Sequence, residues 1–179
     1  MLEDGDGILV QRCREGDRRA FEALVVRYQK PVFNAALRML RNPDDARDVS
    51  QTVFLKVYEH LADYDPTYRF YSWIYRIAVN ESINTLSRRR RHEPIVGDEV
   101  DVSIGPEGNV HGQQVGRGIE RALMTLKPDF RSVIVLRHFL ECSYQDMAEI
   151  LSLPEKTVKS RLFAARQLLA EALRRDGVA

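Results

Sequence analysis

The sequence SYQDMAEILSLPEKTVKSRLFAAR, residues 143–166, predicts two short helices in succession and decides the fold of the second half of the chain. Ser143 is a good N-cap, and Asp146 three positions later completes a capping-box-like helix start. At helical spacing, one face of the first helix carries Tyr144, Met147, Ala148 and Leu151. We therefore expect a helix of two turns that buries this face.

A tight turn and a basic helix follow the first helix. Ser152 and Leu153 form the turn, and Pro154 suits the start of the next helix because its missing N–H needs no partner there. Apolar residues again share one face, at Val158, Leu162, Ala165 and Leu169. The candidate DNA contacts of this helix are Lys156, Thr157, Lys159, Ser160, Arg161, Phe163 and Arg166.

Two interpretations of this pair of helices compete. A major-groove reader needs a short helix, a tight turn and a second helix that brings small polar and basic side chains to base edges and phosphates. A small helical bundle with a merely solvated basic face would also show a basic helix. Because the capped first helix, the turn and the basic second helix occur together, we favour a DNA-binding helix-turn-helix.

Helical periodicity also dominates the rest of the chain, apart from one segment. It runs from Ile8 to Arg91, and no stretch shows the alternation typical of a strand. Residues 92–116 lack this periodicity, are interrupted repeatedly by glycine and proline and contain few bulky apolar residues. The sequence therefore predicts an all-α protein: a helical domain at 1–91, a flexible linker at 92–116 and a helix-turn-helix domain at 117–179.

The helices expected in the first domain are separated by proline-containing turns. Pro31 interrupts the first apolar stripe, and Asn42-Pro43 ends one helix and starts another that runs to about Leu61. A loop at 64–67 leads to a helix over about 70–89.

Charge is distributed unevenly, although the net charge is only +1. Residues 1–91 hold 16 basic and 13 acidic side chains, and residues 117–179 hold 11 and 8. The predicted linker holds five acidic side chains and no lysine or arginine. Two basic segments around an acidic one fit two nucleic-acid contacts joined by a linker that phosphates repel.

Aromatic residues are concentrated before and within the last helix of the first domain. Six of the 15 aromatic residues lie in the 12 positions 64–75: Tyr64, Tyr68, Phe70, Tyr71, Trp73 and Tyr75. Arg76, Asn80 and Asn84 then form one polar stripe, and a run of four arginines ends at Arg91. Aromatic faces stack on unpaired bases and amides pair with base edges, so this segment is a candidate site for single-stranded DNA. Aromatic residues at helical spacing are also common in cores, and both interpretations stay open, with Trp73 the one we expect in the core.

The sequence offers no catalytic or cofactor-binding motif. It has no glycine-rich phosphate loop, nucleophile elbow or His-Glu-x-x-His motif, and we expect neither an enzyme nor a cofactor. His138 and Cys142 could form half a metal site, but no further ligand pair lies nearby, so we expect no metal. The acidic start and the lack of a long apolar run predict a cytoplasmic protein without membrane insertion.

Three segments resemble conserved regions of the extracytoplasmic-function (ECF) sigma factors of bacteria. DDARDVSQTVFL at 44–55 resembles region 2.2, FYSWIYRIAVN at 70–80 resembles regions 2.3 and 2.4, and the sequence at 140–166 resembles region 4.2. The three occur in the family's order and at its separations. The resemblance covers nearly the whole chain.

The resemblance implies a role for each segment. The helix at 44–55 would grip the clamp of the RNA polymerase core through Asp48, Val49, Gln51, Thr52, Phe54 and Leu55. The loop at 64–71 with Asn80 would hold a flipped base of the promoter minus-ten element. The helix at 156–166 would read the minus-thirty-five element, while its domain meets the polymerase flap and the linker passes near the RNA exit path. An anti-sigma factor is a further partner that the family implies.

Two positions depart from the family pattern. Thr52 stands where the family usually has an acidic residue, and Ala164 stands where some members have a basic residue facing DNA. The resemblance therefore predicts neither the strength of one polymerase contact nor the minus-thirty-five sequence.

We expect a sigma factor that brings polymerase to particular promoters and helps to open them. One alternative is a stand-alone helix-turn-helix regulator, which would bind duplex DNA without polymerase. A second alternative is a protein-interaction module, in which the basic and aromatic surfaces would have no role in DNA binding. Its binding would lack the steep salt dependence of phosphate contacts.

Overall fold

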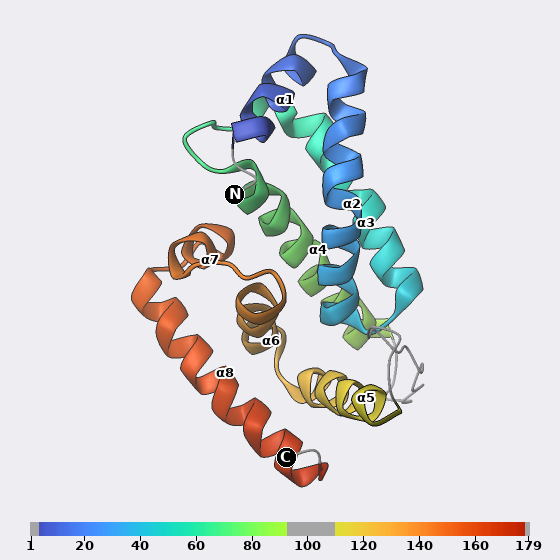
Figure 1. Cartoon of the computed structure of the whole chain (residues 1–179), viewed down its shortest axis with the longest axis vertical. Helices are drawn as coiled ribbons and strands as arrows, with labels where there is room; N and C mark the ends of the chain where they lie inside the picture. The colour runs from blue at the N-terminus through green and yellow to red at the C-terminus, as the bar shows by residue number, and fades with distance from the viewer. Residues whose placement is uncertain (1–3, 93–109, 178–179) are drawn as a thin grey trace.

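The computed structural model describes residues 4–92 and 110–177, and these form helices joined by short loops, with no strand among them. Four long or medium helices make the first domain: α1 (Asp4–Arg14), α2 (Arg18–Leu40), α3 (Pro43–His60) and α4 (Phe70–His92). A short 3-10 turn, η1 (Leu61–Asp63), follows α3. Figure 1 shows α2, α3 and α4 running side by side, with α1 across one end. The all-α prediction is confirmed.

Local sequence signals set the helix starts in this domain. The Asp17 side chain accepts hydrogen bonds from the backbone N–H groups of Arg19 and Ala20 and so caps α2. Asn42 caps α3 by accepting from the N–H of Asp45 at 2.9 Å, and Pro43 occupies the first turn. Lys56 on α3 then pairs with Glu81 on α4 at 2.6 Å, which ties the two helices together at the surface.

The second domain contains α5 (Val110–Thr125), α6 (Pro128–Ile134), the π-helical turn η2 (Val135–Phe139), α7 (Tyr144–Leu151) and α8 (Glu155–Arg175). Ser143 and Asp146 form the expected capping box at the start of α7. Ser152 ends α7 in the left-handed conformation, with φ of 53°, so the turn reverses the chain in very few residues. The predicted helix-turn-helix is therefore present.

Several element boundaries differ from the sequence-based predictions. Helix α2 continues through Pro31, since the residues on both sides of it pack into the core and hold the helix where the proline removes one hydrogen bond. Helix α5 begins at Val110, inside the segment predicted as linker, and the rest of that linker, 93–109, lies outside the described residues. Helix α8 is 21 residues long, not a short helix, because its apolar stripe continues to Ala172.

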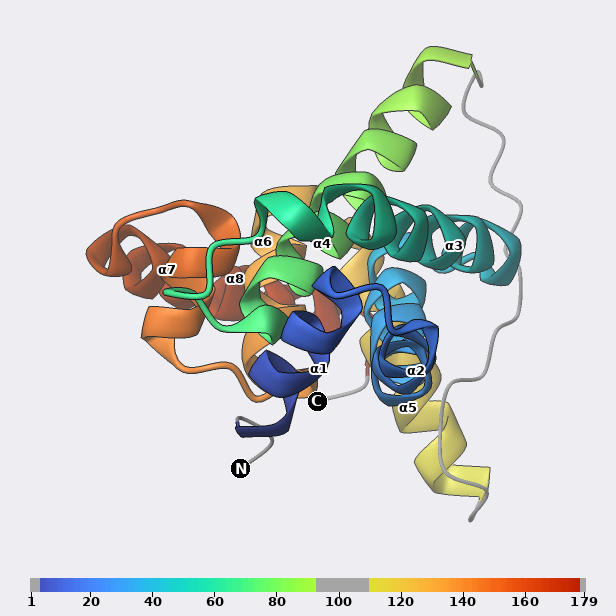
Figure 2. The same ribbon diagram turned by 90° about the horizontal axis from the view of Figure 1, so that it is seen from above.

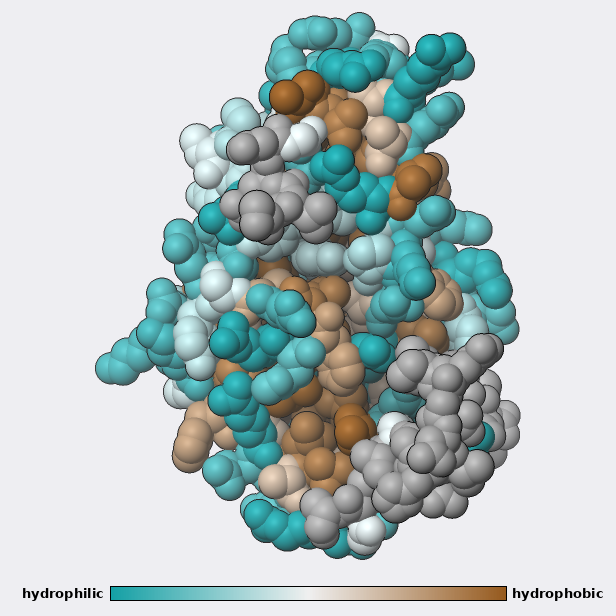
Figure 3. Space-filling view, viewed as in Figure 1, coloured by the Kyte–Doolittle hydropathy of each residue, from teal (hydrophilic) through white to brown (hydrophobic). Residues whose placement is uncertain are grey.

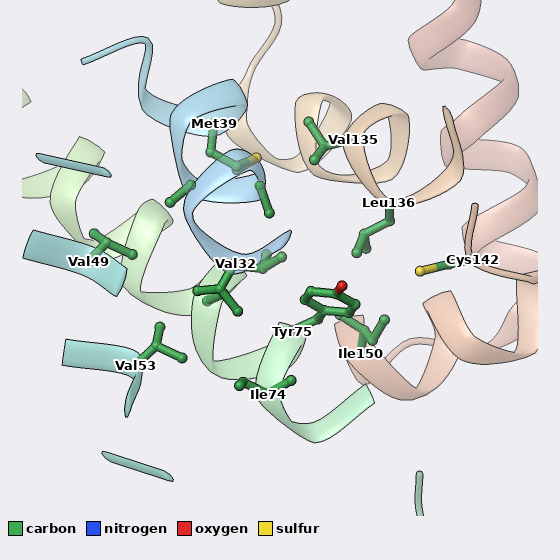
Figure 4. Packing of buried hydrophobic residues seen from close by; sticks show 14 of the residues in the cluster. Val32, Met39, Val49, Val53, Ile74, Tyr75, Val135, Leu136, Cys142 and Ile150 are labelled. Atoms are coloured by element: carbon green, nitrogen blue, oxygen red, sulfur yellow. The ribbon is translucent and has the colours of Figure 1, made fainter. Parts of the chain in front are cut away.

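The two domains share one continuous apolar core in this structure. The buried cluster joins residues of α2, α3 and α4 to residues of α6, η2, α7 and α8. Figure 4 shows Tyr75 of α4 pointing toward Leu136, Cys142 and Ile150 of the second domain. In the view of Figure 3, apolar side chains are exposed along the middle of the molecule, over α6 and its neighbours. Polar side chains cover much of the rest of this face. The domains are therefore packed against each other along a seam, formed by α2 and α4 on one side and by α6, η2 and α7 on the other.

Arg131 reinforces this packing through hydrogen bonds to backbone carbonyl groups. Its guanidinium is buried and donates to the carbonyl oxygens of Leu123, Met124 and Leu126 at 3.0, 2.9 and 3.0 Å. It also donates to the carbonyl of Met39, near the end of α2 in the other domain. Burial lowers the pKa of Arg131 to about 10, which still leaves it charged at neutral pH.

The capping box gives a stability prediction. Replacing Ser143 by Ala should destabilise α7 by about 1 kcal/mol, because the N–H of Asp146 loses its side-chain acceptor. Hydrogen exchange of the α7 amides and urea unfolding would measure the change. Ser87→Ala, at an exposed serine of α4, serves as the control and should change the free energy of unfolding by no more than about 0.5 kcal/mol. Equal effects of the two changes would contradict the role of the cap.

Candidate nucleic-acid interface

Helix α8 presents its predicted DNA contacts on the face opposite the core. Val158, Leu162 and Ala165 are fully buried. The exposed residues are Lys156, Lys159, Ser160, Phe163 and Arg166, while Thr157 and Arg161 are half-buried. Phe163 has 66% of its surface exposed, which is unusual for a phenylalanine and suits apolar contact with a thymine methyl group. The periodicity thus predicted correctly which residues of α8 are buried, and DNA binding by the exposed ones stays a prediction.

The cations on α8 are held by neighbouring side chains. Lys159 pairs with Glu155 at 2.5 Å and lies 5.2 Å from the ring centre of Tyr144, and the hydrogen bond that Lys159 donates to the Glu155 carboxylate raises the pKa of Lys159. Arg161 lies 3.8 Å from Asp129 of α6. These contacts fix the direction of the cationic groups while Lys159 stays solvent-exposed, so they arrange positive charge along the first turns of α8.

His138 and Cys142, the pair for which the sequence predicted no metal, lie in different surroundings. His138 Nε2 accepts a hydrogen bond from Nε of Arg166 at 3.3 Å, and burial together with Arg166 lowers the pKa of His138, so the ring is neutral at pH 7. Cys142 is buried, which raises its pKa to about 12. Within 4–92 and 110–177, no three potential ligands come together as a metal site would require.

The aromatic segment is divided between the core and a small surface pocket. Tyr64 and Phe70 are 6% and 3% exposed, and their rings pack edge-on at 5.7 Å. Phe70 also meets Tyr28 of α2 at 5.4 Å. These two rings lie in the core because the loop folds back over α1 and α2, and in this structure their faces are not open to a base. The core interpretation therefore applies to Tyr64 and Phe70, and the DNA-binding interpretation stays a prediction for the exposed residues of the segment.

Two of the remaining aromatic residues, Tyr68 and Trp73, line a pocket of about 190 Å³ beside α4, whereas Tyr75 is buried at the seam. Tyr68 is 51% exposed, and Tyr71 and Trp73 are half-buried, so the expectation that Trp73 is wholly core is too strong. Tyr68 and Trp73 line the pocket with Ser72, Arg76 and parts of Tyr64. Asp63, Asp65 and Glu149 also line the pocket, so aromatic rings, one guanidinium and three carboxylates meet there.

The polar stripe of α4 extends from this pocket toward the arginine run. Asn80 and Asn84 are exposed, whereas Arg76 is turned toward the second domain and donates to the carbonyl of Glu149. In the arginine run, Arg89 pairs with Asp45 of α3, and Arg88, Arg90 and Arg91 are exposed. Helix α4 therefore carries an amide stripe that leads into a cationic end.

A broad apolar groove lies between α2 and α3, and sequence reasoning found only one side of it. Its volume is about 780 Å³, and Gln51, Phe54 and Leu55 of the predicted polymerase contacts line it. Lining residues that were not predicted are Phe21, Val25, Gln29, Lys30, Phe33, Arg47, Ser50 and Tyr58. The exposure of Leu55 and Tyr58, 62% and 64%, shows an apolar surface without a partner inside the described chain.

The other predicted polymerase contacts lie in different surroundings. Asp48 is exposed on α3, and the hydroxyl of Thr52 donates to its carbonyl at 2.9 Å. Val49 is only 4% exposed because it belongs to the inner stripe of α3, so its side chain cannot touch a partner here. Its place in the contact set stays a prediction, one that this buried position does not support. The motif match at 44–55 did not distinguish the outer face of α3, which is open to a partner, from its inner face, which is buried.

Comparison with known proteins places the chain in a family. Residues 24–92 match the model of sigma-70 region 2, and residues 117–169 match that of sigma-70 region 4. The chain is 31% identical over 185 residues to the RNA polymerase sigma-H factor of Pseudomonas aeruginosa, covering 97% of this chain and 96% of the relative. It is 34% identical over 176 residues to the ECF RNA polymerase sigma-E factor of Haemophilus influenzae, covering 92% and 93%.

A solved structure supports the same assignment. CnrH, in its complex with the cytosolic domain of CnrY, matches with a TM-score of 0.75 at 27% identity, covering 97% of this chain and 99% of CnrH. The chain belongs to the sigma-70 family of transcription initiation factors. Within that family it is an ECF-type RNA polymerase sigma factor, and it is neither an enzyme nor a stand-alone regulator. Across the described helices, none has the length and apolar character needed to cross a membrane.

The exposed face of α8 yields a prediction about duplex DNA. Replacing Lys159 and Arg161 by Ala should weaken binding to duplex promoter DNA and lower the slope of log affinity against log salt by about one unit for each phosphate that is no longer neutralised. Fluorescence anisotropy across a salt series would measure both quantities. The matched control is Arg174→Ala with Arg175→Ala, at exposed residues at the far end of α8. Loss of polymerase binding to the same degree as DNA binding would contradict the assignment of this face.

Proposed function

We propose that each surface described above serves one step of promoter recognition. The α2–α3 groove binds the polymerase clamp, the aromatic pocket with Asn80 and Asn84 holds the unpaired minus-ten strand, and α8 reads the minus-thirty-five duplex while its domain meets the flap. The polymerase and minus-ten surfaces belong to the domain predicted at 1–91 and the minus-thirty-five surface to the domain predicted at 117–179, although α5 extends the second domain back to Val110. The chain acts in the cytoplasm, where polymerase and the chromosome are found.

One observation carries this assignment: three surfaces of different chemistry occur on one small helical chain. The groove is apolar and suits a helical protein partner. The pocket beside α4 offers rings, a guanidinium and nearby amides, which suit unpaired bases. Helix α8 offers exposed cations and small polar groups, which suit a major groove. A duplex-binding regulator would need only the third surface.

We further propose an anti-sigma factor as a regulatory partner. The support is the likeness over nearly the full length to CnrH, whose structure was solved with the cytosolic domain of CnrY. The exposed apolar groove offers such a partner the same surface that the clamp would use, so the two would compete. Capture of partners by the tagged chain from a cell lysate, with and without added purified core polymerase, would test that competition, and added core polymerase should reduce the captured regulator.

Run-off transcription is the direct test of the proposed function. Core polymerase, the purified chain and a library of genomic fragments should give discrete transcripts that core polymerase alone does not produce. Sequencing of the transcript starts would then reveal the minus-ten and minus-thirty-five elements. If no fragment yields a transcript that depends on the chain, the proposal fails.

The groove yields a prediction about polymerase binding. Leu55→Glu should weaken co-migration with core polymerase at least about tenfold, because a carboxylate would lose hydration in an apolar contact. Val26→Glu is the matched control, since Val26 is also exposed, at 70%, but does not line the groove. Gel filtration or biolayer interferometry would measure both affinities. Equal losses would mean that the groove is not the docking surface.

The amide stripe yields a prediction about promoter opening. Asn80→Ala should slow strand opening more than it weakens duplex binding, because Asn80 meets bases only after they part. Permanganate reactivity of unpaired thymines measures opening, and a filter assay on the same promoter measures duplex binding. Unchanged opening with weakened duplex binding would assign Asn80 to the duplex instead.

A further inference from the structure

We propose that Arg14, in the last turn of α1, is a positioning residue for the aromatic pocket beside α4. The inference deepens the proposed function and rests on it, because that function assigns the pocket to an unpaired base of the minus-ten element. Arg14 belongs to none of the surfaces described above. Figures 1 and 2 both show α1 beside the loop that joins α3 to α4, and this loop supplies Tyr68 and other residues of the pocket.

The guanidinium of Arg14 holds the backbone at the start of this loop. Its Nε donates to the carbonyl oxygen of Leu61 at 3.1 Å, and one terminal nitrogen donates to the carbonyl oxygens of Ala62, at 3.1 Å, and Tyr64. Leu61 and Ala62 belong to η1, directly after α3, where carbonyl groups at a helix end need donors from outside the helix. One side chain from a distant part of the sequence thus fixes the direction in which the chain leaves α3.

Tyr64 carries this constraint to the pocket. Its ring centre lies 5.2 Å from that of Trp73 and 5.9 Å from Cζ of Arg14, which also holds its carbonyl group. Its hydroxyl donates to the carbonyl oxygen of Tyr68. Within the described chain, Tyr68 and Trp73 line the pocket and Arg14 does not. Arg14 therefore acts on a bound base through Tyr64 and Tyr68, without touching it.

Helix α1 is attached to α2 at both ends, so Arg14 is itself held in place. Near the start of α1, the buried carboxylate of Asp6 accepts a hydrogen bond from the hydroxyl of Tyr28. At the end of α1, Arg12 pairs at 2.6 Å with Asp17, the N-cap of α2. Arg14 lies between these two attachments along the chain. Its bonds therefore tie the loop to the body of the first domain.

Loss of these bonds should loosen the loop and leave the core intact. Arg14 is exposed, and the buried rings of Tyr64 and Phe70 keep their contact with each other without it. Residues 61–64 would then populate several conformations, of which only some place Tyr68 at the pocket. Because apparent affinity falls with the fraction of molecules in the competent conformation, capture of an unpaired base would weaken. Duplex binding through α8 would not change.

An exposed arginine can also act by attracting a phosphate, and a lysine variant separates the two roles. Lysine keeps the positive charge, but its single ammonium group lacks the planar fork with which the guanidinium reaches three carbonyl oxygens. If Arg14 positions the loop, Arg14→Lys should behave like Arg14→Ala. If it only attracts phosphate, Arg14→Lys should behave like the unaltered chain.

The experiment measures promoter opening by core polymerase with the full-length chain, on a promoter found by run-off transcription with the unaltered chain. Arg14→Ala and Arg14→Lys should each slow the appearance of permanganate-reactive thymines about five- to tenfold and change duplex binding by less than about twofold. Arg19→Ala removes an exposed arginine at the start of α2 and is the matched control, which should change neither quantity. Circular dichroism would check that each variant folds.

A double-mutant cycle with Tyr68→Ala tests whether Arg14 acts through Tyr68. Once the Tyr68 ring is removed, Arg14→Ala should slow opening by less than about twofold more, because the side chain that it positions is gone. A purely structural role of Arg14 would slow opening equally with and without that ring.

Four outcomes would overturn the inference: normal opening with Arg14→Lys, additive effects in the cycle, equal slowing by Arg19→Ala, or an equal loss of duplex binding. Run-off transcription by the unaltered chain decides the proposed function separately. If that chain starts no transcript, the proposed function fails and the inference fails with it. Normal transcription by the unaltered chain together with any of the four outcomes refutes the inference alone.

Discussion

Helix α4 packs on two sides, and this double packing is the constraint on which the rest of the structure depends. Ile74 and Ala78 are buried among α2 and α3, while Tyr75 points toward the second domain. Arg76, next along the chain, bonds to α7. One helix therefore holds the core of the first domain, forms the seam with the second and carries the amide stripe proposed for DNA, so a change in one role affects the others.

The aromatic loop shows how burial and recognition are combined in a few residues. Tyr64 and Phe70 pack inward, and the guanidinium of Arg14 on α1 donates to backbone carbonyls of this region, including that of Tyr64. The buried rings fix the loop, so Tyr68 and Trp73 are held at the rim of a pocket. A rigid pocket loses less entropy on binding a base than a free loop would.

Apolar surface is used differently in the two parts of the molecule. The seam between the domains is covered within the chain, whereas the α2–α3 groove remains open with Leu55 and Tyr58 exposed. An exposed apolar groove of this size is unfavourable in water unless a partner covers it. The proposed partners for this groove are polymerase and a regulator, which would compete for it.

Local interactions explain what the sequence determined by itself. Helical spacing, the capping box at Ser143 and the proline-marked starts act within a few residues, so the helix-turn-helix and the outer face of α8 were predictable. Tertiary contacts decided the rest: the burial of Val49, Tyr64 and Phe70, the α2 side of the groove, and the packing of α7 on α4. These depend on which surfaces meet across long stretches of chain, and a residue's local pattern does not contain that information.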